Sequence, residues 1–244
     1  MGRIRLTGLD RLLSPFLLVP LPMPSSTVEN YLKQIYLEQQ KTPERLVAMG
    51  HLADAMGVTP GTATTMVKTL ANSGLIEYEP RMGARLTDAG EQLALHVLRR
   101  HRLVESFLVK TLGLDWAEVH EEAEALEHVI SDKVLERIDE MLRYPRLDPH
   151  GDPIPTAEGT VQPRKLAALT NCEVGSSVRI ARMIDQGVQF LQFADRSSLK
   201  PGTQVTIEEL DPIADSLTIR PDDREPITLG TKAASKILVE QTNA

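Results

Sequence analysis

The stretch that decides the fold is GVTPGTATTMVKTLANSGLIEYEPRMGARL, residues 57–86. The short amphipathic segment His51–Met56 before it predicts a helix that ends at the turn Gly57-Val58-Thr59. Residues Pro60–Ser73 predict a second helix, which Gly74 closes. A short helix, a glycine turn and a second helix in succession are typical of a helix-turn-helix.

Two short strands complete this unit. Residues 75–79 alternate between apolar and polar, residues 80–83 have turn composition, and residues 84–86 form a return strand. A hairpin directly after the second helix is a wing, so the sequence predicts a winged helix-turn-helix.

The amino end of the second helix and the wing are the parts expected to touch DNA, because they reach the major groove and the phosphate backbone. Threonine hydroxyls can bind phosphates or base edges, and basic side chains bind phosphates. The alternative is that the threonines only cap the helix and the arginines are solvated. The predicted DNA-binding residues are Thr59, Pro60, Gly61, Thr62, Thr64, Thr65, Lys68, Arg81 and Arg85.

Upstream of this unit, the apolar spacing in residues 25–40 predicts an amphipathic helix, and residues 45–49 predict a further short helix. The apolar run at residues 12–23 follows basic residues, as in a signal peptide. It is interrupted by prolines, however, and is too short to span a bilayer. We therefore expect a disordered or docking extension over residues 1–24, or a true start at Met23.

Downstream, Thr87 is expected to cap a long helix that runs to about Leu112, and a further helix is expected from Asp115 to Leu142. The apolar face of this further helix is the predicted dimerisation surface. After a Pro/Gly/Asp-rich linker, several alternating runs predict a small β-barrel.

The predicted architecture is mainly α with a small β part: a winged helix-turn-helix, a helical metal-binding and dimerisation domain, and a C-terminal SH3-like β-barrel. The predicted boundaries are 1–24 for the extension, 25–96 for the winged helix, 97–148 for the helical domain, 149–168 for the linker and 169–244 for the barrel.

Charge is distributed unevenly along the chain. The net charge is −7, but residues 1–100 carry 11 Lys/Arg against 9 Asp/Glu, whereas residues 101–150 carry 6 against 12. An acidic middle suits a cation better than a phosphate. The single cysteine, Cys172, excludes an internal disulfide and any multi-cysteine metal site, and it is expected to be a small buried residue.

Two clusters in this acidic middle have metal-ligand character. His101 and Glu105 are spaced i, i+4 on the predicted long helix. His120, Glu124, Glu127 and His128 form one stripe of the next helix. Imidazole and carboxylate without thiolate suit Mn²⁺ or Fe²⁺, with Zn²⁺ as a competitor. The alternative is that these are ordinary surface charges.

The pair His120-Glu121 also allows an enzymatic interpretation. His120-Glu121 resembles the start of a zinc-peptidase helix, but that motif needs a second histidine four residues after the first. Glu124 stands there, so we expect no enzymatic activity.

Five stretches resemble the diphtheria toxin repressor family of iron- and manganese-dependent regulators, which carry a C-terminal SH3-like or FeoA-like domain. They are TVENYLKQIY (27–36), LTDAGEQLA (86–94), RRHRLVESFL (99–108), VHEEAEALEHVISD (119–132) and PHGDPIP (149–155). The resemblance covers roughly residues 26–155 well and residues 175–239 loosely.

The resemblance implies two metal sites between the winged helix and the dimerisation helices. For the first it implies His101, Glu105 and His120, completed by barrel residues for which Asp185, Gln186 and Gln189 are candidates. For the second it implies Asn30, Glu124, Glu127 and His128.

Two departures from the family pattern bear on the metal. Iron-type members carry cysteine at the position of Glu124, whereas manganese-type members carry glutamate there. Manganese-type members, however, have carboxylates at the positions of Asn30 and Lys33. We therefore expect Mn²⁺ first and Fe²⁺ close behind, with Zn²⁺, Co²⁺ or Cd²⁺ as surrogates.

The predicted function is a metal-activated homodimeric repressor of manganese or iron homeostasis genes. It is expected in the cytoplasm, bound to an inverted-repeat operator in double-stranded DNA, with no membrane partner. The alternative is a winged-helix regulator that responds to a different ligand and keeps only vestigial metal sites.

Overall fold

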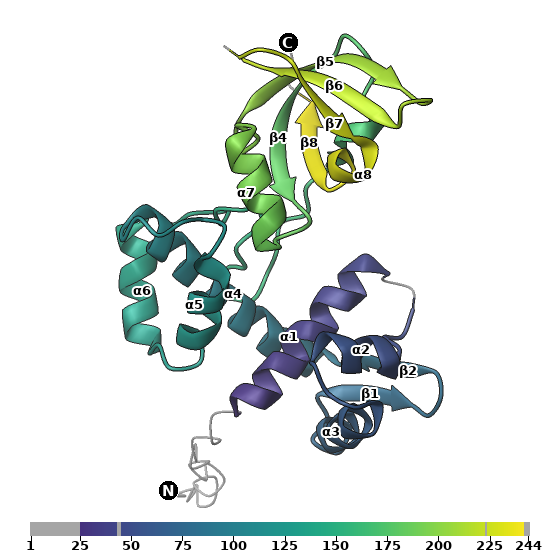
Figure 1. Cartoon of the computed structure of the whole chain (residues 1–244). Coiled ribbons are helices and arrows are strands. Elements are labelled where there is room, and N and C mark those ends of the chain that lie inside the picture. The colour runs from purple at the N-terminus through teal and green to yellow at the C-terminus, as the bar shows by residue number, and fades with distance from the viewer. Residues whose placement is uncertain (1–24, 43–44, 223, 242–244) are drawn as a thin grey trace, which may run out of the picture.

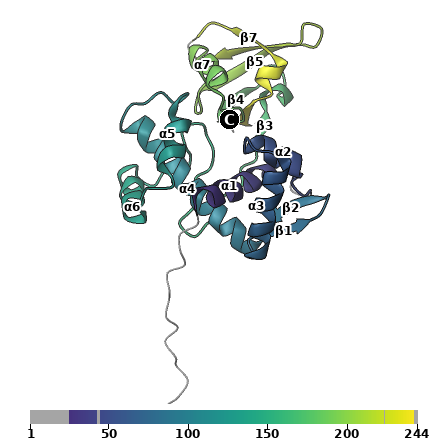
Figure 2. The same ribbon diagram turned by 60° about the horizontal axis from the view of Figure 1, so that its bottom comes forward.

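The computed structural model describes residues 25–42, 45–222 and 224–241. The predicted extension, residues 1–24, lies outside the described residues. Three groups of elements meet at α4 (Asp88–Lys110): a winged helix, a pair of short helices and a β-domain. Figure 2 shows the β-domain lying across both of the other groups.

The winged helix is confirmed. It contains α1 (Ser26–Lys41), α2 (Met49–Ala55), α3 (Pro60–Asn72) and the antiparallel wing of β1 (Ile76–Glu79) and β2 (Gly83–Leu86). Its core is apolar and continuous across these elements and the first half of α4. Ser25 caps α1 and Thr59 caps α3, each accepting a backbone hydrogen bond from three residues along the chain.

The helix predicted at residues 45–49 is wrong over most of that range. Val47 forms an isolated antiparallel bridge with Ala84 of the wing, with hydrogen bonds of 2.8 and 3.0 Å in the two directions. The neighbouring Gly83 has a φ of 145°, and a Cβ there would lie 2.5 Å from the Val47 carbonyl oxygen. Glycine therefore allows the chain to pack closely enough to anchor the wing.

The long helix α4 connects the winged helix to the rest of the molecule. Thr87 caps it as predicted, accepting a hydrogen bond from the Gly90 amide. Its first half packs in the winged-helix core and its second half packs against the short helices. None of the helices in the described ranges is long and apolar enough to cross a membrane.

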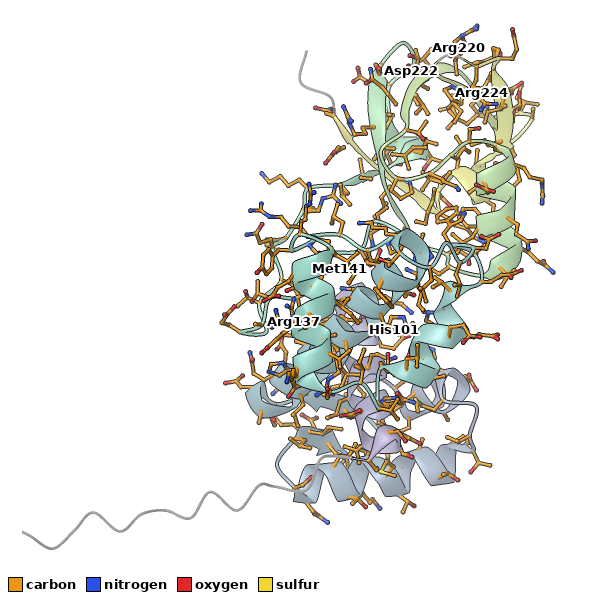
Figure 3. All side chains as sticks on the ribbon, turned by 90° about the vertical axis from the view of Figure 1, so that its left-hand side faces the viewer. His101, Arg137, Met141, Arg220, Asp222 and Arg224 are labelled. Carbon is orange, nitrogen blue, oxygen red and sulfur yellow. The ribbon has the colours of Figure 1, made fainter. Side chains whose placement is uncertain are left out.

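The single helix predicted from Asp115 to Leu142 is wrong. The chain forms α5 (Val119–Leu126) and α6 (Asp132–Met141), separated by a turn. Ser131 starts α6 by accepting a hydrogen bond from the Val134 amide, a capping signal that the apolar periodicity concealed. Arg137 and Met141 lie on the outward face of α6 (Figure 3).

The C-terminal domain is an antiparallel six-stranded sheet in the order β3-β8-β4-β5-β6-β7. Bulges in β4 and β5 interrupt the register and bend the sheet. The predicted strands are confirmed, and Cys172 is partly buried against this core. The helix α7 was not predicted. The elements are β3 (Ala167–Ala168), η1 (Leu169–Asn171), β4 (Ser177–Met183), α7 (Val188–Arg196), β5 (Gln204–Asp211), β6 (Ser216–Pro221), β7 (Ile227–Gly230), α8 (Thr231–Ala234) and β8 (Ile237–Gln241).

The segment predicted as a linker, residues 149–168, contains no helix or strand before β3, but its start is buried together with the preceding Asp148. Asp148, His150 and Asp152 are all under 10% exposed. The Met183 amide of β4 donates a 2.9 Å hydrogen bond to the His150 carbonyl. At Gly151, a Cβ would lie 2.0 Å from the Ala181 carbonyl oxygen, so only glycine allows this close contact. The C-terminal domain thus fixes the position of His150.

Candidate metal centre and nucleic-acid interface

Glu105 lies at the centre of three histidines. Its carboxylate is 1% exposed. Oε1 lies 3.0 Å from Nε2 of His101 and 3.3 Å from Nδ1 of His120, while Oε2 lies 3.7 Å from Nδ1 of His150. We call Glu105, His101, His120 and His150 the first cluster. It joins α4 and α5 to the loop held by the C-terminal domain, and Figure 3 shows His101 deep between these parts.

His150 is the residue that sequence reasoning missed. Its Nε2–H donates a 2.7 Å hydrogen bond to the Trp116 carbonyl, which leaves Nδ1 on the side of Glu105. Nδ1 is buried and has no hydrogen-bond partner among the described residues. A histidine held by a backbone carbonyl through one nitrogen, with the other nitrogen free, has the usual arrangement of a metal ligand.

The signal for His150 stood in PHGDPIP, a stretch whose Pro/Gly/Asp composition indicates a linker. Asp148 comes two residues earlier, and Glu105, Asp148 and His150 each offer one ligand atom within 4.8 Å of the others.

In the first cluster, the contacts between the histidines and the acidic side chains favour protonated histidines beside ionised carboxylates. Burial lowers the pKa of His101, but hydrogen bonds with Glu105 and Glu127 outweigh it and raise that pKa to about 9. Burial likewise lowers the pKa of His150, while Glu105 and Asp148 raise it to about 9. Burial raises the pKa of Glu105, but its histidine partners hold it well below the ordinary value.

Asp148 and Asp152 extend the cluster toward the C-terminal domain. Burial and the neighbouring Asp152 carboxylate raise the pKa of Asp148 to about 7. Asp148 accepts hydrogen bonds from the amides of His150 and Asp152, and Asp152 pairs with Arg102 and Arg182. These contacts stiffen the loop that carries His150.

The residues on the other side of His101 form a second cluster, which we define as Lys33, Glu124 and Glu127. The Lys33 Nζ lies 2.6 Å from Glu124 Oε1 and 2.7 Å from Glu127 Oε1. His101 Nδ1 lies 2.6 Å from Glu127 Oε2, so one imidazole touches both clusters. Burial raises the pKa of Glu127, but His101 and Lys33 outweigh it and lower that pKa.

Two other residues implied for a second metal site, Asn30 and His128, are not part of the second cluster and differ in position. The Asn30 side-chain oxygen is buried and has no hydrogen-bond partner in the described part of the chain. His128 Nδ1 lies 2.5 Å from Glu29 Oε2, and its Nε2 lies 3.2 Å from Glu127 Oε1. His128 therefore borders the second cluster, while no hydrogen bond in the described part of the chain joins the Asn30 oxygen to it.

The three candidates from the C-terminal domain differ in position. Asp185 pairs with Lys236 and accepts a hydrogen bond from the Gly187 amide, and Gln189 is exposed. Gln186 donates a 2.7 Å hydrogen bond to Asp152. Only Gln186 of the three lines the cavity of about 510 Å³ that also contains Lys33, His101, Glu105 and His120.

The predicted DNA-binding residues lie on one accessible part of the winged helix. Thr59, Pro60, Gly61, Thr62, Thr65 and Lys68 of α3 and its cap are exposed, Thr64 is half-buried, and Arg81 and Arg85 of the wing are exposed. The Thr64 and Thr65 hydroxyls donate to the backbone carbonyls of Pro60 and Gly61, which leaves their oxygen lone pairs as acceptors. Arg85 pairs with Glu77 across the wing at 2.6 Å.

Family models match three successive parts of the chain. The DNA-binding domain of iron-dependent repressors matches residues 23–84, and the metal-binding and dimerisation domain of iron-dependent repressors matches residues 87–156. The FeoA domain matches residues 167–241.

Curated relatives match over most of their length. The iron-dependent repressor IdeR of Mycobacterium leprae is 31% identical over 229 residues, which is 88% of this chain and 97% of that protein. The regulator MntR of Lysinibacillus sphaericus is 31% identical over 127 residues, covering 52% of this chain and 89% of that protein.

Solved structures of metal-dependent regulators also match most of the chain. A manganese-dependent transcriptional repressor in complex with manganese has a TM-score of 0.81 at 35% identity, covering 88% of this chain and 100% of that chain. The structure of ScaR with bound Cd²⁺ has a TM-score of 0.72 at 32% identity, covering 88% of this chain and 99% of that one.

Proposed function

The chain belongs to the iron-dependent repressor family of metal-dependent transcriptional repressors, which are not enzymes, and we propose that manganese or ferrous iron activates it by binding around Glu105. The observation that carries this proposal is the buried Glu105 carboxylate with a histidine nitrogen on three sides. Two of these nitrogens come from elements other than α4, so binding couples separate parts of the chain.

The donor set fits a divalent cation. His101, Glu105 and His120 offer ligand atoms within 4.8 Å of one another, and His150 adds a buried nitrogen without a hydrogen-bond partner. Imidazole and carboxylate donors without thiolate suit Mn²⁺ and Fe²⁺, and they also accept Zn²⁺, Co²⁺ or Cd²⁺. Of the C-terminal candidates, we propose Gln186 as a further ligand, because it lines the same cavity.

The protein's own groups supply the switch. Without metal, His101 and His150 balance Glu105 as histidinium ions, and they give up these protons when they become ligands. His101, Glu105, His120 and His150 would hold a divalent cation, which would supply positive charge there, and these ligands would connect α4, α5 and the His150 loop. His150 depends on β4 for its position, so the C-terminal domain takes part in this selection of one conformation.

The DNA-binding and dimerisation domains indicate that the partners are DNA and a second copy of the chain. Two-fold symmetry pairs two copies of α3, so we expect an inverted-repeat operator. The exposed apolar side chains Val134 and Met141 of α6 supply a surface for the second copy. We infer that a repressor of this kind works at the chromosome, in the bacterial cytoplasm.

The test begins with a duplex selected from random-sequence DNA by the full chain in the presence of manganese. Its affinity is then compared with manganese, ferrous iron, zinc and chelator. We expect tight binding with manganese and ferrous iron and weak binding with chelator. His101→Ala should lose this response, while His96→Ala, an exposed histidine on the same helix, should keep it.

The second candidate is a winged-helix regulator that responds to another ligand and keeps only vestigial metal sites. The observation in its favour is Lys33, which already pairs with two of the implied ligands. Equal operator binding with manganese and with chelator would support this candidate and exclude the metal switch.

A further inference from the structure

The second cluster already contains a cation, the Lys33 ammonium. Its Nζ is within hydrogen-bond distance of both Glu124 and Glu127. Lys33 is 6% exposed and Glu127 is 0% exposed, so this is a buried contact rather than a solvated surface pair. A metal ion bridging the same two carboxylates would need the space that Nζ occupies.

The Nε2 of His128 is buried without a hydrogen-bond partner among the described residues, but Glu127 and Asn30 are unsuited to a metal ion. Glu127 uses Oε1 for Lys33 and Oε2 for His101. Asn30, which the family resemblance implies as a ligand, offers only a neutral amide oxygen, and this buried oxygen has no hydrogen-bond partner among the described residues. The residues present therefore do not fit a second metal ion while Lys33 holds this position.

Lys33 also makes the connection that a metal ion would make. It comes from α1 of the winged helix, whereas Glu124 belongs to α5 and Glu127 caps its carboxyl end. The contacts bridge residues that are 91 and 94 positions apart in the sequence. This bridge between the winged helix and the helical domain needs nothing from solution.

We propose that Lys33 is the built-in cation of the second cluster, so that the cluster takes no metal and the response is carried by the first cluster alone. The inference rests on the proposed function, because it assigns the metal response to Glu105 and its histidines. It makes Lys33 the residue that sets how many metal ions each protomer binds.

The test uses the full chain and manganese. Crystals of the wild type grown with Mn²⁺ are examined by anomalous scattering, and bound manganese is counted by equilibrium dialysis. We expect anomalous density at the first cluster and none between Glu124 and Glu127. Lys33→Glu, which supplies a third carboxylate in place of the ammonium, should bind one more manganese per protomer than the wild type.

Two control variants distinguish the effect of the charge at residue 33 from the effect of a charge change elsewhere on α1. Lys33→Arg keeps a cation and should bind as many ions as the wild type. Lys41→Glu makes the same charge change at an exposed site on α1 and should also leave the count unchanged.

Manganese between Glu124 and Glu127 in the wild type, with Lys33 displaced, would overturn the inference while leaving the proposed function intact. A folded Lys33→Glu variant that gains no ion would also overturn it. If that variant does not fold, the wild-type density decides alone. Absence of manganese from both clusters would overturn the proposed function and this inference with it.

Discussion

The first and second clusters each contain a buried glutamate that contacts His101, Glu105 in the first and Glu127 in the second, yet they balance their carboxylates differently. Around Glu105 the balancing charges are protons on histidines, which a metal ion can replace. Around Glu127 the Lys33 ammonium joins His101 in balancing the carboxylate, and an ammonium has donors only and cannot act as a ligand while protonated. Metal-binding capacity therefore depends on what neutralises an acidic cluster, not only on its ligand types.

The difference also separates two structural roles. The second cluster connects α1 to α5 through the Lys33 ammonium. The first cluster connects α4 and α5 to a loop that is fixed by β4. We infer that the second connection is permanent and that the first is the one that responds to metal.

The largest expected effect comes from removing the charge that distinguishes the second cluster. Lys33→Met should lower the free energy of unfolding by about 3 kcal/mol, because it leaves the buried Glu127 carboxylate without its ammonium partner. Urea unfolding in chelator at neutral pH measures this. Lys41→Met, at an exposed lysine of the same helix, should change the stability by less than about 0.5 kcal/mol. Equal effects of the two substitutions would show that the bridge contributes no stability.

Neutralising Glu105 should weaken DNA binding but leave the contacts of Lys33 with Glu124 and Glu127 in place. Glu105→Gln should weaken manganese-dependent operator binding by about 100-fold, since the proposed carboxylate ligand that lies near all three histidines is lost. Fluorescence anisotropy of the selected duplex at fixed manganese gives the affinity. Glu91→Gln, an exposed position on the same helix, serves as the control. A Glu105→Gln variant with wild-type metal response would remove Glu105 from the site.

The protonated histidines of the first cluster predict how stability depends on pH. The folded pKa values of His101 and His150, about 9, lie above the unfolded value of about 6.5, so their stabilisation is complete below pH 6.5 and is lost as the pH rises through 9. The Asp148 pKa, raised to about 7, acts in the same direction.

The free energy of unfolding in chelator should therefore fall by about 2 kcal/mol between pH 6.5 and pH 9. Urea unfolding at several pH values measures this fall. With saturating manganese, the stability should rise over the same range, because metal binding releases these protons. Stability in chelator that increases with pH would contradict the assigned charges.

The smallest expected effect leaves both clusters intact. Lys68→Ala should reduce the slope of log affinity against log salt concentration by about one and leave the bound manganese unchanged, because Lys68 is predicted to contact one phosphate. Operator binding measured from low to physiological salt tests this. An unchanged slope would show that Lys68 lies away from the DNA.

Local signals were sufficient to predict the winged helix and part of the first cluster. Thr59 and Gly74 delimit the second helix of the helix-turn-helix, and the spacing of His101 and Glu105 places both on one helix face. The turn before α6 was missed, because the apolar spacing continues across residues 127–131 and outweighed the capping signal of Ser131.

Other features depend on tertiary contacts that no local pattern contains. His150 becomes a candidate ligand only because β4 and the Trp116 carbonyl fix its position. Lys33 meets its carboxylates only because α1 and α5 both pack against α4, which brings together residues more than 90 positions apart. The sequence shows that Lys33 departs from the family pattern, but not where its ammonium lies.

The most direct test of the account is a manganese titration of operator binding by the full wild-type chain, with chelator as the reference. The account predicts that saturating manganese strengthens binding of the selected duplex by about 100-fold or more, the scale of a typical allosteric coupling at its upper end. Binding that is equally tight in chelator and in manganese would contradict it.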